Sequence, residues 1–151
     1  MRLLIVSHMP HYMKDGQVVG WGPTAQEIDH LAQYFDEVWH IAWLHPGSPP
    51  DSSLPYNKKN VHLVPEAPSG GNSILEKIRV LRKIPSYLKT INREMEKADV
   101  IHIRAPASIS LLAMVLLAVK RRPAYRWVKY AGNWQPAIPG SWSYAFQRWW
   151  L

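Results

Sequence analysis

Two short apolar runs constrain the fold of this chain more than any other feature of its sequence. They are RLLIVS (residues 2–7) and DVIHIR (residues 99–104), and each stands beside a segment with a helical pattern or a polar loop. A strand whose residues are apolar in succession, without alternation, is buried on both faces, which is typical of the central strands of parallel sheets. Parallel strands need crossover connections, so helices are expected between them.

The segments between and around these runs supply further strands and helices. Strands are predicted at residues 37–44, 61–65 and 125–132. Helices are predicted at 23–36, 73–84, 86–98 and 107–122, and loops at 8–22 and 45–57, which are rich in Gly, Pro or Ser. Pro85 is expected to split or kink the two middle helical segments. Strands that alternate with helices predict an α/β domain of right-handed βαβ units, with a parallel sheet covered on both sides.

Composition excludes several classes of protein. Apolar residues make up 47% of the 151 residues and charged residues 19%, which argues against disorder. There is no cysteine, and therefore no disulfide, thiolate metal site or cysteine nucleophile, which fits the cytoplasm. The N-terminal apolar run is too short for a signal peptide. The longest apolar segment, residues 105–119, is shorter than the roughly 20 residues that span a bilayer.

Charge is distributed unevenly along the chain. The formal net charge is +7, and residues 100–151 hold seven Lys or Arg and no acidic residue. This asymmetry predicts an anionic partner: a phosphate-bearing substrate, an acidic lipid or a nucleic acid. The chain stops within the aromatic run SYAFQRWWL, without the Gly, Asn or polar residues that usually end a helix. We therefore expect it to be the front part of a longer protein, and a missing acidic segment would also explain the asymmetry.

Polar residues follow three of the predicted strands at their carboxyl ends. They are His8, Arg104 and the segment Gly132–Trp134. Ligands of open α/β sheets bind outside the carboxyl ends of the strands, where the strand order reverses. Arg104 at the end of a buried strand predicts bidentate recognition of a carboxylate or phosphate. The alternative is an ion pair with an acid elsewhere in the chain.

His102, two residues before Arg104, shares its side of the sheet and is a second candidate. A lone strand histidine is more often a hydrogen-bonded core residue than a catalyst, and that alternative stays open. In Gly132–Trp134, an indole ring suits the apolar face of a sugar and the Asn133 amide suits its hydroxyls. A tryptophan packed against a loop would have the same sequence.

The segment GWGPTAQE supplies three further candidates, Gly20, Gly22 and Thr24. A glycine turn that opens onto a helix can bring backbone N–H groups to a phosphate. The glycines come late after the strand and lack a third partner, so the pattern is not a dinucleotide fingerprint, and a Walker lysine is absent. A smaller phosphate or a sugar hydroxyl remains as a ligand, and an irregular turn is the alternative.

Residues 73–97 hold seven basic and three acidic residues, with several of the basic ones off the apolar stripe. The pattern fits a helix on an anionic membrane surface, and it also fits an ordinary solvated face. Nothing in the sequence is typical of a nucleic-acid-binding module, and no cluster of His, Asp and Glu has metal-ligand spacing.

Three segments in this order, MRLLIVSH…GWGPTAQEIDHLAQYFDEVWHIA, ADVIHIRAPASISLL and RWVKYAGNW, resemble the N-terminal half of a retaining, family-4-type glycosyltransferase of the GT-B fold. The resemblance implies a Rossmann-like three-layer domain over residues 1–140. Residues 141–151 would begin a helix that leads to a C-terminal donor domain outside this chain. Arg104 stands where a second histidine is common in the family.

The function implied by this resemblance is transfer of a sugar, with retention, from a nucleotide-sugar donor to a polysaccharide or lipid-linked acceptor. No metal or other cofactor is implied, and the place of action would be the cytoplasm, at the inner face of the membrane. His102 and Arg104 match the catalytic segment that faces the acceptor. Gly20 and Gly22 match the glycine loop near the donor phosphates, and Gly132–Trp134 match the strand end beside the acceptor. His8 and Thr24 are the remaining substrate-binding candidates. The alternatives from the residues are a non-catalytic α/β binding module and a membrane-surface adaptor.

Overall fold

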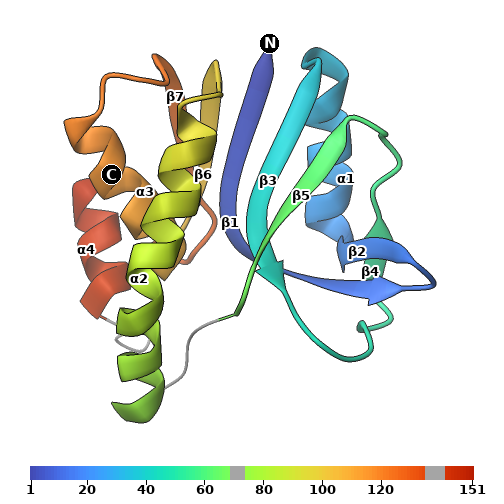
Figure 1. Ribbon diagram of the computed structural model, residues 1–151, viewed down its shortest axis with the longest axis horizontal. Coiled ribbons are helices and arrows are strands. Elements are labelled where there is room, and N and C mark those ends of the chain that lie inside the picture. The colour runs from blue at the N-terminus through green and yellow to red at the C-terminus, as the bar shows by residue number, and fades with distance from the viewer. Residues whose placement is uncertain (69–73, 135–141) are drawn as a thin grey trace.

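The computed structural model describes residues 1–68, 74–134 and 142–151, and side chains in the second range from residue 81. Within these residues the chain is an α/β protein with one mixed sheet of seven strands and with four α-helices (Figure 1). The strands are β1 (Arg2–Lys14), β2 (Gln17–Trp21), β3 (Glu37–Leu44), β4 (Ser53–Pro55), β5 (Val61–Glu66), β6 (Val100–Ala105) and β7 (Tyr125–Tyr130). The helices are α1 (Gly22–Leu31), α2 (Ile74–Met95), α3 (Ser108–Val119) and α4 (Trp142–Trp150), with the 3-10 turn η1 (Ala32–Tyr34) after α1.

Five strands pair in parallel, in the order β5-β3-β1-β6-β7. The apolar runs singled out in the sequence are β6 and the first half of β1, and they are neighbours at the centre of the sheet. The chain first adds strands on one side of β1 and then on the other. The strand order therefore reverses between β1 and β6, which is where such sheets bind ligands.

Helices cover both faces of the parallel strands. On one face, α2 and α3 contribute Tyr87, Ile91, Met95 and Ile109 to a core with Leu4, Val6, Ile101 and Ile103. On the other face, Ala25 and Ile28 of α1 pack with Leu3 and Ile5. Residues of β1 alternate between the two cores, which explains the continuous apolar run in the sequence.

The purely parallel sheet and the loop predicted at residues 8–22 are both wrong. β1 continues to Lys14, and its outer half pairs antiparallel with β2, which in turn pairs antiparallel with β4. Asp15 and Gly16 form the two-residue turn with positive φ angles of 50° and 77°, as tight hairpins require. The Asp-Gly pair was the sequence signal for this hairpin, and the neighbouring glycines and proline obscured it.

The two helical segments predicted at 73–84 and 86–98 are one helix, α2, with Pro85 inside it. An interior proline costs about 3 kcal/mol because it removes a hydrogen bond and crowds the preceding turn. Burial of Tyr87, Ile91 and Met95 against the sheet offsets that cost, since each large side chain contributes roughly 1.5–3 kcal/mol. The predicted domain boundary at residues 140 and 141 lies outside the described residues.

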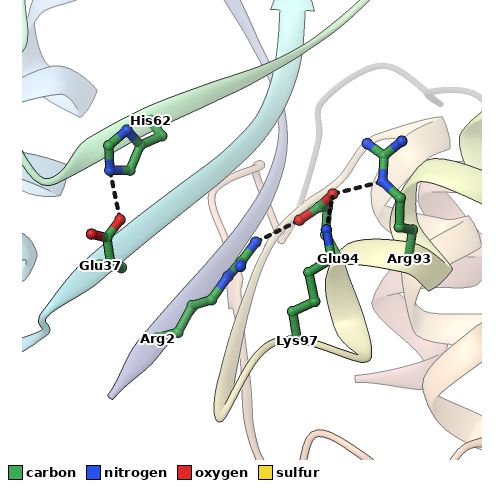
Figure 2. Close-up of polar contacts among 6 residues, drawn as sticks. All are labelled: Arg2, Glu37, His62, Arg93, Glu94 and Lys97. Atoms are coloured by element: carbon green, nitrogen blue, oxygen red, sulfur yellow. Dashed lines mark hydrogen bonds and ion pairs between the residues drawn. The ribbon is translucent and has the colours of Figure 1, made fainter.

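The amino-end edge of the sheet holds a compact set of ion pairs (Figure 2). Arg2 of β1, Arg93 and Lys97 surround the carboxylate of Glu94, at 2.5, 2.7 and 3.5 Å. Glu94 is buried, and the Arg2 guanidinium also lies 4.4 Å from the ring centre of Trp39. Burial would raise the pKa of Glu94, but its cationic partners outweigh that effect and lower it. These pairs tie α2 to β1 at the edge opposite the candidate site.

Candidate functional site

A layer of polar side chains lies under α1 at the carboxyl half of the central strands. Ile5 of β1 lies opposite His40 on one side and His102 on the other. Side chains alternate along a strand, so His40 and His102 share the α1 face with Val38 and Val100. Arg104, two residues beyond His102, lies on the same face beside Lys129 of β7.

Arg104 joins β6 to α1. Its Nη1 donates to Glu27 Oε1 at 2.7 Å and its Nη2 to Thr24 Oγ1 at 3.3 Å. Thr24 and Glu27 are three residues apart, so they lie on the same side of the first helical turns. Arg104 therefore has the intramolecular acid partner that the sequence left open as its alternative.

Lys129 brings a second cation to the same carboxylate. Its Nζ lies 2.8 Å from Glu27 Oε1, the oxygen that also accepts from Arg104. Burial alone would raise the pKa of Glu27, but the hydrogen bonds from Arg104 and Lys129 outweigh it and lower the pKa. The cluster of Thr24, Glu27, Arg104 and Lys129, the carboxyl-edge cluster, holds two cations and one anion. Arg104 is nearly buried, whereas Lys129 and part of Glu27 reach solvent.

His102 is buried beside this cluster. Its ring stacks on Trp127, with 4.7 Å between ring centres and 24° between planes. Among the described residues neither ring nitrogen has a hydrogen-bond partner. Burial and the positive charge of Arg104 lower the pKa of His102 to about 4. The neutral ring is thus a weak proton acceptor near neutral pH, and it suits accepting or donating a hydrogen bond better than general base catalysis.

A closed ring of hydrogen bonds lies on the other side of Ile5. Ser7 Oγ bonds His40 Nε2 at 2.7 Å, His40 Nδ1 bonds the Tyr56 hydroxyl at 3.0 Å, and Tyr56 bonds His11 Nε2 at 2.7 Å. His11 Nδ1 lies 3.1 Å from the Met9 carbonyl, and the Met9 N–H donates to Ser7 Oγ. The ring thus begins and ends on the backbone of Met9.

The proton positions in this ring follow from its ends. The Met9 carbonyl can only accept, so His11 carries its proton on Nδ1 and accepts from Tyr56 at Nε2. Tyr56 therefore accepts from His40 Nδ1, and His40 accepts from Ser7 at Nε2. Both histidines must be neutral for this arrangement. Burial lowers the pKa of His11 to about 4 and that of His40 well below its ordinary value.

The first strand and its hairpin contain three of the candidates from the sequence. His8 has one part of its side chain in solvent, and its ring meets Trp43 edge-on at 5.9 Å. Desolvation of the rest and the charge of Arg104 lower the pKa of His8. Gly20 and Gly22 lie in β2 and at the start of α1. A Cβ on Gly20 would come within 2.4 Å of the Met9 side chain, and one on Gly22 within 2.7 Å of the Ser52 carbonyl.

Gly22 donates its N–H to the Ser52 carbonyl at 3.0 Å. Close packing within the β1-β2-β4 corner therefore accounts for both glycines. Their predicted role in binding a ligand stays a prediction. Of the three candidates predicted in the segment GWGPTAQE, only Thr24 joins the carboxyl-edge cluster.

The segment after β7 lies against the start of the β6–α3 connection. Ala131 donates its N–H to the Ala105 carbonyl at 2.7 Å, and a Cβ on Gly132 would come within 2.9 Å of Pro106. Trp134 is 56% exposed, and its ring lies 4.5 Å from that of Tyr130. Asn133 lies between them in sequence. An exposed indole beside a tyrosine provides a flat surface of the kind that sugars stack on.

Sequence reasoning missed Glu27, Lys129 and the residues of the hydrogen-bonded ring. The sequence did contain a signal for Glu27. It follows Thr24 by one helical turn, and both residues lie near the start of the predicted helix, which faces the carboxyl edge of the sheet. Lys129 could have been found from the parallel register that places it beside Arg104. No signal in one sequence brings Tyr56, from the loop after β4, to His11 and His40.

Among the described residues, no group of three or more His, Asp and Glu is placed to hold a metal ion. Within the same residues, no helix is both long and apolar enough to cross a membrane. Comparison of the chain with protein-family models, with curated proteins and with solved structures finds no match.

Proposed function

We propose that the chain is the acceptor-side, Rossmann-like three-layer domain of a GT-B glycosyltransferase that transfers sugar with retention. The observation that supports this proposal is the carboxyl-edge cluster at the point where the strand order reverses. Sugars need both donors and acceptors, and a carboxylate held between a guanidinium and an ammonium offers both. The nucleotide-sugar donor would bind to a second domain outside this chain, and no metal or cofactor is part of the proposal.

In this account the ligand contacts the exposed parts of Glu27 and Lys129, and Arg104 positions Glu27 from beneath. The exposed ring of Trp134 covers an apolar sugar face, together with Gly132 and Asn133. His8 forms the neighbouring wall of the site, and Gly20 and Gly22 shape it through the close packing of the β1-β2-β4 corner. His102 would act through hydrogen bonding from below the cluster, since its low pKa does not favour proton abstraction.

The acceptor proposed here is a polysaccharide or a lipid-linked glycan, reached from the cytoplasm at the inner face of the membrane. Peripheral contact with anionic lipid through the basic residues of α2 belongs to the same proposal, and Arg82, Lys89 and Arg93 are exposed there. No nucleic acid is involved. The alternative function is a non-catalytic binding or adaptor module, which would not need an arginine and a carboxylate at this edge.

Glycan binding by the chain tests the proposal. Saturation-transfer NMR would be recorded with maltotriose, cellotriose and chitotriose as soluble acceptor mimics, and with UDP-glucose and GDP-mannose as donors. We expect a trisaccharide to bind and the nucleotide sugars not to bind, because the donor half is outside this chain. Arg104→Ala and Glu27→Gln should each weaken trisaccharide binding at least fivefold.

The matched control is Arg82→Ala, which removes an exposed arginine from α2, away from the cluster. Circular dichroism of each variant separates loss of binding from loss of folding. Absence of binding for all three trisaccharides, or equal binding by wild type and both cluster variants, would remove the acceptor-site proposal. The adaptor alternative would then be the better account.

A further inference from the structure

The last helix, α4, presents its apolar stripe to solvent. Trp142, Ala145, Phe146, Trp149 and Trp150 are all exposed, and their spacing of three and four residues places them on one side of the helix. The polar Gln147 is instead fully buried, where its Oε1 accepts from the Ala107 N–H at the start of α3. A surface helix normally has the opposite arrangement, with polar residues outward.

The exposed side chains form a patch with specific chemistry. Trp142 and Trp149 are each 80% exposed, and Phe146, Trp149 and Trp150 line an open hollow. The ring of Phe146 contacts those of Trp149 and Trp150, at 5.7 and 5.4 Å between ring centres. Tryptophan is enriched where proteins meet the bilayer interface, because its ring is large and apolar with one polar N–H.

The charged residues nearest to this patch in sequence are all basic. Arg148 belongs to α4, and its Nη1 lies 3.5 Å from the Tyr130 hydroxyl. The helix α4 packs beside α3 (Figure 1), and Arg121 and Arg122 follow α3 in sequence. Residues 100–151 contain no acidic side chain. An apolar aromatic stripe with basic residues and no acid near it in sequence is complementary to the surface of an anionic bilayer.

A second copy of the chain fits the patch less well. Four aromatic side chains of roughly 150–250 Å² each, at the exposures seen here, offer about 350–600 Å². A stable dimer buries about 800 Å² on each partner.

We propose that α4 binds an anionic bilayer at its surface, with Trp142, Trp149 and Trp150 inserted at the level of the headgroups. The helix lies in the interface and does not cross it, because nine residues span only about 14 Å. This contact is separate from the glycan site and from the basic face of α2. It requires no sugar and no catalysis.

Co-sedimentation of the chain with lipid vesicles tests the proposal. The vesicles would be phosphatidylcholine alone or phosphatidylcholine with 30% phosphatidylglycerol. We expect at least tenfold stronger partitioning onto the anionic vesicles, with a blue shift of tryptophan fluorescence, and a sharp loss near 1 M salt, where the Debye length is about 3 Å. The double variant Trp142→Ser/Trp149→Ser should lose at least fivefold in partitioning.

The control is Trp21→Ser, which removes an exposed tryptophan from β2, and it should partition like the wild type. Circular dichroism of each variant confirms folding. Equal partitioning by the wild type and the double variant overturns the proposal. So does binding that falls with Arg82→Glu/Lys89→Glu and not with the α4 variant, since it assigns the contact to α2. If the chain does not bind vesicles but forms a dimer through Trp149, the proposal is overturned in favour of a second copy of the chain.

Discussion

At the scale of single residues, three buried histidines make the stability of the protein depend on pH below about 6.5. His11, His40 and His102 are each no more than 1% exposed. Burial lowers the pKa of His11 and His102 to about 4 and lowers that of His40 well below its usual value. In the unfolded chain these groups titrate near pH 6.5. The folded protein therefore binds fewer protons than the unfolded chain below that pH.

Stability should accordingly fall as the pH drops from about 6.5 toward 4. Above pH 6.5 the three histidines are neutral in both states and have no effect, and below it the unfolded state gains protons that the folded state does not. We predict a loss of about 3–4 kcal/mol in the free energy of unfolding between pH 7.5 and 5.5. Urea unfolding at both values measures it. A free energy that is flat over this interval would mean that the histidines are not held neutral.

Tyr56→Phe tests the hydrogen-bonded ring. Among the described residues, the hydroxyl of Tyr56 is the one hydrogen-bonded link between His11 and His40, and its loss leaves a buried donor and a buried acceptor without partners. We predict a destabilisation of about 1–3 kcal/mol at pH 7.5 in urea unfolding. Tyr34→Phe, at a 69% exposed tyrosine, is the control and should stay within about 0.5 kcal/mol of the wild type. Equal effects of the two changes would contradict the ring.

The alternation of side chains along a strand predicts which face of the sheet a residue lies on, but not which residue it contacts. The side of the sheet shared by His102 and Arg104 followed from their spacing and is confirmed by their common face under α1. The partner of Arg104 could not be chosen, because any of the acidic residues in the first 99 positions was compatible with the sequence. Only the docking of α1 across β6 selects Glu27.

At the scale of elements, local sequence signals determine where the short strands lie, whereas tertiary packing determines whether a helix continues through a proline. The predicted positions of β3, β5, β6 and β7 agree with the structure because each is a short segment rich in β-branched or aromatic residues between clear breaks. The hairpin of β1 and β2 escaped notice because residues 8–22 contain a proline and three glycines. Continuity of α2 through Pro85 depends on packing against β1 and α3, which no local pattern contains.

Docking of α4 onto α3 depends on one buried amide, and Gln147→Leu tests it. Leucine nearly preserves the volume but leaves the Ala107 N–H without its acceptor. We predict a loss of about 1–3 kcal/mol in the free energy of unfolding, measured with urea. Gln147→Glu, which retains an acceptor at the positive end of α3, should recover part of that loss. A Gln147→Leu variant as stable as the wild type would show that this bond does not hold α4 in place.

At the scale of the whole molecule, the charged clusters at the two edges of the sheet differ in their exposure to solvent. At the amino edge, Glu94 is buried among its cationic partners and links elements together. At the carboxyl edge, Glu27 and Lys129 are partly exposed beside a buried arginine. The parallel order of the strands was predictable from alternation of strands and helices. The antiparallel extension that carries His11 and Gly20 could not be predicted from the sequence. The hydrogen-bonded ring that joins Ser7, His40, Tyr56 and His11 could not be predicted either.

The most direct test of the central claim compares Arg104→Lys with wild type in glycan affinity. Lysine keeps the positive charge but loses the guanidinium fork that joins Thr24 to Glu27. The dissociation constant of the trisaccharide that binds best would be measured by calorimetric titration, with Arg82→Lys as the matched control. The account predicts about a tenfold weaker affinity for Arg104→Lys and an unchanged affinity for Arg82→Lys. Equal affinities for all three proteins would contradict a glycan site at the carboxyl edge.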